Sequence, residues 1–175
     1  VDSTYDSKLL VSCSGGLRAS VMKKVTHEDI EGEIVTIKVR GLKGGHSGID
    51  INKERGNANK ILGRILINVE KNYSSINIVD IFGGAKDNAI PREAECQIEV
   101  DKEDVDNIIL AVKSVEKVIK NELECEEDFH VIVSKDEAPR RKNMMSLKDS
   151  KDIIDLMYLM PNGIKTQSMS IKDLV

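Results

Sequence analysis

A histidine stands inside a glycine-rich loop, GLKGGHSGID, which covers Gly41 to Asp50. Glycine allows the backbone to approach a ligand closely, and imidazole exchanges protons and hydrogen bonds near neutral pH. His46 is therefore a candidate for proton transfer or for hydrogen bonding to a substrate. The alternative is a turn in which the histidine only caps the helix that follows.

A second glycine-containing loop, FGGAKDNAIPREA, covers residues 82–94 and places Asn88 before an Ile-Pro pair. An asparagine in such a loop is usually a turn residue, and proline at the first position of a strand needs no ladder donor. The functional alternative is an amide that binds substrate.

Other polar residues fit structural roles better. His27 lies in the acidic segment THEDIEGE, and His130 alternates along an expected strand, which favours structural or solvent-facing positions for both. The adjacent pair Glu126 and Glu127 is expected to form a solvated turn between a helix and a strand.

The segments around the two loops alternate between the periods of strands and helices. Their order, βαββαβ, predicts an α+β fold, the ferredoxin-like two-layer sandwich, whose antiparallel sheet carries both helices on one face. An N-terminal strand pair, 9–13 and 17–25, and a C-terminal helix, 147–160, are expected outside this core. The core strands are expected at 33–42, 76–82, 94–100 and 129–133, and the core helices at 53–71 and 104–120.

The strand at residues 94–100 alternates most regularly between apolar and acidic or amide side chains. Such a pattern predicts one face against the core and the other in water. The patterns divide the chain into three parts. Residues 1–28 form the end of a preceding segment with its strands, residues 29–135 form the core, and residues 136–175 form the C-terminal helix and return segment.

Composition excludes several classes of protein. Aromatic residues are 3% of the chain and the net charge is -4 with dispersed basic residues, so a nucleic-acid partner is not expected. No apolar run approaches the roughly 20 residues of a membrane span. Cys13, Cys96 and Cys125 are widely spaced, which predicts buried free thiols in a reducing cytoplasm. The chain begins at Val1 rather than at methionine, which suggests an excised fragment.

The two loops, together with the upstream VDSTYDSKLLVSCSGGL, resemble the middle of the aminoacyl-histidine dipeptidases of the peptidase D type, within the dinuclear-zinc peptidases. The GGHSG and NAIPREA blocks occur in the order found in that family, and the resemblance covers essentially the whole chain. It implies hydrolysis of dipeptides with a C-terminal histidine by two bridged zinc ions in a cytoplasmic homodimer. It also implies that this chain is the lid, or dimerisation, segment inserted in a catalytic domain.

The resemblance assigns roles to three residues. His46 matches the lid histidine that reaches the partner's active site and stabilises the oxyanion, and Asn88 matches a substrate-binding asparagine. Asp2, in VDST, matches a zinc ligand, although Tyr5, Asp6 and Ser7 depart from the acidic residues usual after it. The other metal ligands and the general base would lie outside this chain.

Two other functions stay open, namely a self-contained ferredoxin-like regulatory or small-molecule-binding domain and a purely structural dimerisation module. A zinc site needs three or four ligands, so the chain alone is expected neither to bind zinc fully nor to hydrolyse peptides. An open sheet leaves unpaired edges. The expected dimer therefore joins edge strands or the helices at residues 53–71.

Overall fold

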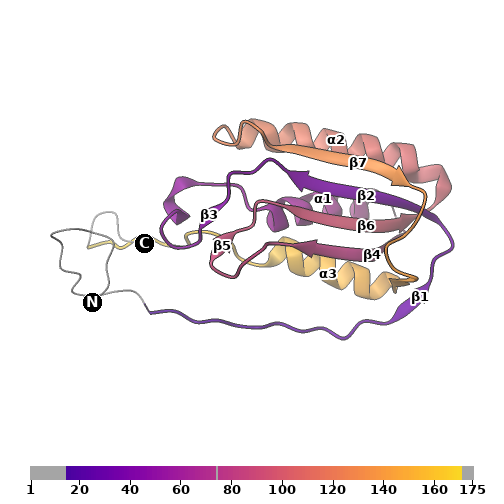
Figure 1. Cartoon of the computed structure of the whole chain (residues 1–175), viewed down its shortest axis with the longest axis horizontal. Helices are drawn as coiled ribbons and strands as arrows, with labels where there is room; N and C mark the ends of the chain where they lie inside the picture. The colour runs from indigo at the N-terminus through magenta and orange to yellow at the C-terminus, as the bar shows by residue number, and fades with distance from the viewer. Residues whose placement is uncertain (1–14, 74, 171–175) are drawn as a thin grey trace.

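A four-stranded antiparallel sheet forms the centre of the molecule. The computed structural model describes residues 15–73 and 75–170. Within them the strands lie in the order β4-β6-β2-β7, so that β4 and β7 form the two edges (Figure 1). Their bounds are β2 (Glu33–Arg40), β4 (Ile76–Gly83), β6 (Ala94–Val100) and β7 (His130–Asp136).

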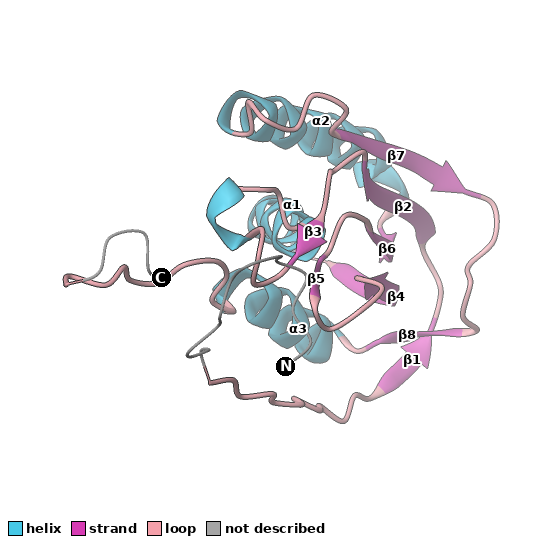
Figure 2. Ribbon diagram, turned by 60° about the vertical axis from the view of Figure 1, so that its left-hand side comes forward, coloured by secondary structure: helices cyan, strands magenta, loops and turns pink. Residues whose placement is uncertain are grey.

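Three helices cover one face of this sheet (Figure 2). They are α1 (Ala58–Asn72), α2 (Val105–Glu122) and α3 (Leu147–Leu159), and α1 contacts both of the others. The α+β class is confirmed, and β2-α1-β4-β6-α2-β7 follows the expected βαββαβ order. The C-terminal helix expected at 147–160 is present as α3.

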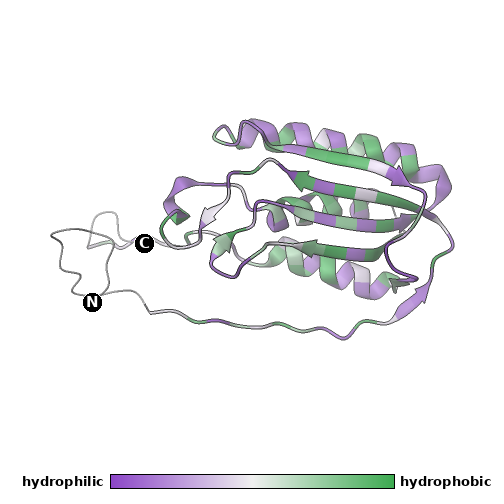
Figure 3. Cartoon of the chain, viewed as in Figure 1, coloured by the Kyte–Doolittle hydropathy of each residue, from purple (hydrophilic) through white to green (hydrophobic). Residues whose placement is uncertain are grey.

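The apolar face of the sheet packs against the helices. Alternate residues of β2 and β6 point to this side, and Figure 3 shows the corresponding alternation of hydropathy along strands and helices. These inward residues are at most 1% exposed, which builds the core mainly from aliphatic side chains: Val35, Ile37, Val39, Ala94, Cys96, Ile98 and Val100. Gly63 of α1 permits a close crossing, because a Cβ there would lie 3.0–3.2 Å from Met157 of α3.

The helix expected from residue 53 begins later, at Ala58. The Asn57 side chain accepts hydrogen bonds from the backbone amides of Asn59 and Lys60, at 3.0 and 3.3 Å, and so caps the helix. Residues 51–53 form the separate 3-10 helix η1 (Ile51–Lys53). The expected start was therefore wrong, because the helix begins directly after its capping residue Asn57 and does not continue back to residue 53.

The polar face of β6 is buried, contrary to the expectation that it meets water. Glu95 is 3% exposed, Gln97 1% and Glu99 9%. The connection from β7 to β8 (Asn143–Met145) crosses this face, where Arg140 forms an ion pair with Glu95 and donates its backbone N–H to Gln97. Burial is tolerated because the polar groups find partners there.

The expected N-terminal strand pair is also wrong in its second member. Residues 17–25 form no strand, and residues 9–13 lie outside the described residues. Instead β1 (His27–Asp29) pairs with β8. The segment before β1 is extended but exposed, with Leu17 96% and Met22 92% accessible, since it finds no neighbouring strand among the described residues.

Asp149 of α3 fixes the chain just before β1. Its carboxylate accepts from the Thr26 backbone N–H at 2.8 Å and lies 2.8 Å from the Lys23 ammonium. These two residues, with Ser146, hold the pKa of Asp149 well below its usual range. The division of the chain at residues 28 and 135 stays a prediction.

Candidate functional site

The two glycine-rich loops meet in a small sheet at one end of the molecule. Strand β3 (Gly45–His46) pairs with β5 (Ala89–Ile90), with His46 opposite Ala89 (Figure 1). The backbone N–H of Ser47 also donates to the carbonyl of Asn88 at 3.0 Å. Both His46 and Asn88 are exposed. Residues far apart in the sequence are thus neighbours on one surface.

The His46 ring is held by its own loop. Nδ1 accepts two backbone hydrogen bonds, from Gly48 and Ile49, each at 3.1 Å. A nitrogen that accepts from amides carries no proton, so the neutral ring has its proton on Nε2. The arrangement therefore presents a hydrogen-bond donor to a molecule outside the loop. The ring does not cap the following helix, a role that Asn57 takes.

Charged side chains make contacts within the His46 loop. Asp50 accepts the backbone N–H of His46 at 2.7 Å and lies 2.7 Å from the Lys53 ammonium. Hydrogen bonds from Lys53 and from the backbone of His46 lower the pKa of Asp50. Arg55 donates to the carbonyl of Gly44. Gly45 lies against these groups with a φ of +150°, and a Cβ there would be 2.3 Å from the Arg55 guanidinium.

Glu126 is part of this region, and its expected place in a solvated turn was wrong. It is 3% exposed, whereas Glu127 is exposed as expected. Its carboxylate accepts the backbone N–H groups of Lys43 and Gly56, at 2.8 and 2.9 Å. No local sequence pattern could show this contact, because its partners are 83 and 70 residues away.

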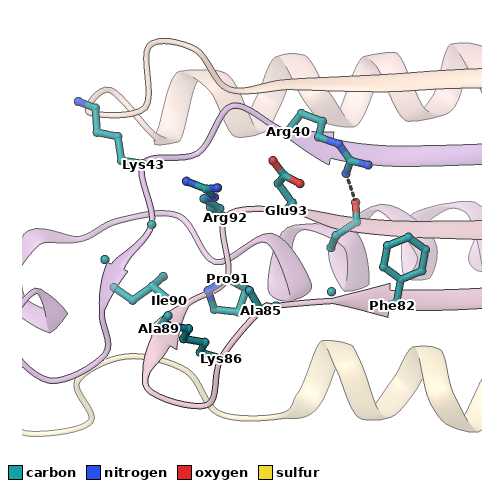
Figure 4. A pocket seen from close by; sticks show the side chains of 15 residues that line it. Arg40, Lys43, Phe82, Ala85, Lys86, Ala89, Ile90, Pro91, Arg92 and Glu93 are labelled. Carbon is teal, nitrogen blue, oxygen red and sulfur yellow. Dashed lines mark hydrogen bonds between the residues drawn. The ribbon is translucent and has the colours of Figure 1, made fainter.

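A basic groove lies beside the small sheet (Figure 4). It encloses about 500 Å³ between the ends of β2 and β4 and the strand β5. Four of its side chains are cationic, Arg40, Lys43, Lys86 and Arg92, and one, Glu93, is anionic. Arg40 is already paired with the buried carboxylate of Glu95 and donates to the carbonyl of Ala94 at 3.0 Å, so Lys43, Lys86 and Arg92 are the cations that matter for a ligand. The groove is therefore suited to an anionic group.

The remaining candidate residues do not join this site. His27 is exposed in β1, and His130 is exposed with Nδ1 2.8 Å from the carbonyl of Asp128. Asp2 lies outside the described residues. Within the described residues, no three His, Cys, Asp or Glu side chains gather as a metal site, so the chain's own described side chains do not supply one.

The cysteines differ in their surroundings. Cys96 is buried in the core, and burial raises the pKa of its thiol. Cys125 is exposed, so the expectation of a buried thiol was wrong there. Cys13 lies outside the described residues. None of the helices in residues 15–73 and 75–170 has the length and apolar character that crossing a membrane requires.

The α+β fold with its paired glycine-rich loops has known relatives. The model of a family described as the peptidase dimerisation domain, M20, matches residues 37–126. The cytosol non-specific dipeptidase of Escherichia coli (strain K12) is 32% identical over 176 residues, covering 99% of this chain and 36% of that protein. The crystal structure of the aminoacylhistidine dipeptidase from Vibrio alginolyticus aligns with a TM-score of 0.77 and 30% identity, over 86% of this chain and 31% of that one.

The chain belongs to the peptidase dimerisation domain family. The resemblance to dipeptidases seen in the two loops is thereby confirmed at the level of the family. The chain spans about a third of the length of these two relatives.

Proposed function

We propose that this chain is the lid and dimerisation segment of a zinc-dependent dipeptidase that cleaves dipeptides with a C-terminal histidine. The family match and the two dipeptidase relatives support the class of enzyme. The name of the Vibrio alginolyticus relative supports the histidine preference. The catalytic domain, with the zinc ions that activate water, would be supplied by the remainder of the parent protein.

His46 would stabilise the oxyanion that forms when the peptide carbonyl is attacked. The observation that carries this role is the pair of amide hydrogen bonds to Nδ1 on an exposed ring, which leaves Nε2–H as a donor without a partner among the residues that the structure describes. A donor fixed in direction before the reaction stabilises developing charge without reorganisation. The neutral ring suffices for this role, so no proton transfer by His46 is required.

Asn88 and the basic groove would hold the dipeptide. Asn88 directly precedes the strand that pairs with His46, and this closeness supports a role for its amide in binding the same substrate. The groove continues from β5 and carries Lys43 and Arg92. A dipeptide has one terminal carboxylate, and cationic side chains are its natural partners. The groove therefore matches the C-terminal end of the substrate.

The lid would act across a cytoplasmic homodimer. Helix α1 lies between α2 and α3 and its residues from Ala58 to Glu70 are buried or half-buried, which makes it a less accessible surface for the dimer contact. The β4 edge is covered by α3 and β8. The β7 edge is the better candidate. The side chains of Lys113 and Glu116 of α2 already bond the backbone carbonyl and N–H of Val131 at this edge. A partner strand would therefore pair with the residues of β7 that follow Val131.

The test is replacement of His46 by alanine in the full-length enzyme, with His27→Ala as the control. His27 is also exposed but lies in β1, away from the small sheet. Loss of an oxyanion donor lowers kcat by about a hundredfold to a thousandfold, with a smaller change in KM. Equal kcat values for the two variants would refute the role of His46.

A further inference from the structure

The loop that carries His46 is closed at its base by one carboxylate. Oε2 of Glu126 accepts the N–H of Lys43, and Oε1 accepts the N–H of Gly56. These residues stand at the two ends of the segment 43–56, which contains β3, the His46 ring contacts and η1. Glu126 itself belongs to the turn between α2 and β7. A separate part of the core thus joins both ends of the loop.

The turn around Glu126 is itself fixed against the core. The backbone N–H of Glu126 donates to Leu123 at 3.0 Å, and Phe129 donates to the carbonyl of Glu126 at 3.0 Å. Phe129 is 1% exposed. Gly41, just before the loop, has a φ of +78° and comes so close that a Cβ would lie 2.0 Å from the Asp128 carbonyl. The loop base and this turn therefore lie in direct contact.

The chemistry of the contact requires a carboxylate. Two amides donate to two separate oxygens, and a carboxylate has acceptors only. Glutamine has nearly the same shape, but its –NH₂ group would face either the part-buried N–H of Lys43 or the buried N–H of Gly56 and leave that N–H without its acceptor. A buried unpaired N–H is unfavourable. Among the described residues, the side chain of Glu126 bonds to these two amides, one at each oxygen.

We propose that Glu126 is a positioning residue, which holds the His46 loop in the geometry that oxyanion stabilisation requires. This inference rests on the proposed function of His46. Glu126 does not touch substrate, and its effect passes through the backbone of residues 43–56 to the ring. Because the Nδ1 contacts come from the same loop, loosening of its base changes both the position and the direction of the Nε2–H donor.

The test compares Glu126→Gln with two controls of the same chemical change. Glu99→Gln removes a buried carboxylate that accepts the Gly32 N–H at 2.6 Å, at the far end of the sheet. Glu127→Gln changes the exposed neighbour. The first readout is hydrogen exchange of the amides of residues 44–56 in the full-length protein, and the second is kcat and KM of the same samples.

In Glu126→Gln we expect loop exchange to accelerate about tenfold to a hundredfold, as for loss of a hydrogen bond to a charged acceptor. The value of kcat should fall by at least about tenfold with KM nearly unchanged, since donor alignment matters mainly in the transition state. Both controls should keep wild-type loop exchange and wild-type kcat, even where Glu99→Gln lowers the thermal midpoint.

Two results would overturn the inference. One is wild-type loop exchange in Glu126→Gln. The other is a wild-type kcat for Glu126→Gln when His46→Ala is strongly impaired. If His46→Ala itself keeps its activity, the proposed function fails, whereas the exchange experiment still decides whether Glu126 holds the loop.

Discussion

Replacement of Gly45 by alanine should destabilise the conformation of the His46 loop, whereas the same change at Gly48 should not. At Gly45 φ is +150°, and a Cβ would lie 2.3 Å from the Arg55 guanidinium and 3.0 Å from Cβ of Asp50. At Gly48 φ is not in the positive range, and a Cβ would have nothing closer than the His46 ring at 3.4 Å, an ordinary contact.

The magnitude follows from two contributions. A non-glycine residue in a sparsely populated backbone conformation costs about 1–3 kcal/mol. Relief of the clash displaces Arg55 from the Gly44 carbonyl, and an exchange of that bond for water in a partly exposed loop costs about 1 kcal/mol more. We therefore expect Gly45→Ala to destabilise the loop by about 2–4 kcal/mol. Gly48→Ala should be neutral or stabilise by up to about 1 kcal/mol, because it restricts the unfolded chain.

The assay is hydrogen exchange of the amides of Gly48 and Ile49, followed together with the thermal midpoint. A loss of about 2–4 kcal/mol corresponds to exchange faster by roughly thirtyfold to a thousandfold where the loop opens locally. In the parent enzyme Gly45→Ala should also lower kcat. Equal exchange rates and equal thermal midpoints for the two variants would show that the described loop geometry is not what holds His46.

Three further predictions concern the rest of the chain. After dialysis against a mild chelator, elemental analysis should find no stoichiometric zinc on this chain, because zinc affinity depends on the number of ligands. Zinc that stays bound at one ion per chain would contradict this prediction. The chain should sediment as a dimer at micromolar concentration. Val133→Pro removes a backbone N–H from the β7 edge and should shift the chain toward monomer. A variant that stays dimeric would exclude the β7 edge as the dimer contact. The pKa of Asp149 is lowered chiefly by hydrogen bonds from Lys23 and Thr26. Its carboxylate should therefore stabilise the fold at pH values above about 4, the ordinary carboxylate pKa, and this stabilisation should be lost as the pH falls below that value. The difference in thermal midpoint between wild type and Asp149→Asn should therefore shrink on acidification, and a constant difference would contradict the assignment.

Periodicity predicted the elements of the core because their burial is one-sided along helices and strands. It failed at β6. The alternation from Ala94 to Val100 correctly predicted a strand, but it did not predict that the polar face of this strand is buried. That face is covered by a segment containing Arg140, more than 40 residues along the chain, and a strand pattern carries no information on such cover. The same reason explains residues 17–25, whose apolar alternation finds no strand partner among the described residues.

The roles of the candidate site residues stay predictions, and the sequence could not show their geometry. The glycine-rich loops singled out His46 and Asn88 but left a turn role open for both, and the family resemblance implied their functional roles. The two loops lie side by side because β3 pairs with β5, and this pairing joins segments that are far apart in the sequence. Glu126 was missed because a buried carboxylate that accepts amides looks, in the sequence, like any acidic residue in a turn.

The central claim, that His46 completes the active site of a partner subunit, is tested most directly by mixing two inactive variants of the full-length enzyme. One carries His46→Ala, and the other carries an intact His46 but lacks a zinc ligand of the catalytic domain. If His46 acts in trans, each mixed dimer contains one complete site. Random exchange of subunits then makes about half of the dimers mixed and restores about a quarter of wild-type activity. Activity that stays at the level of the separate variants, with subunit exchange verified, would contradict the claim.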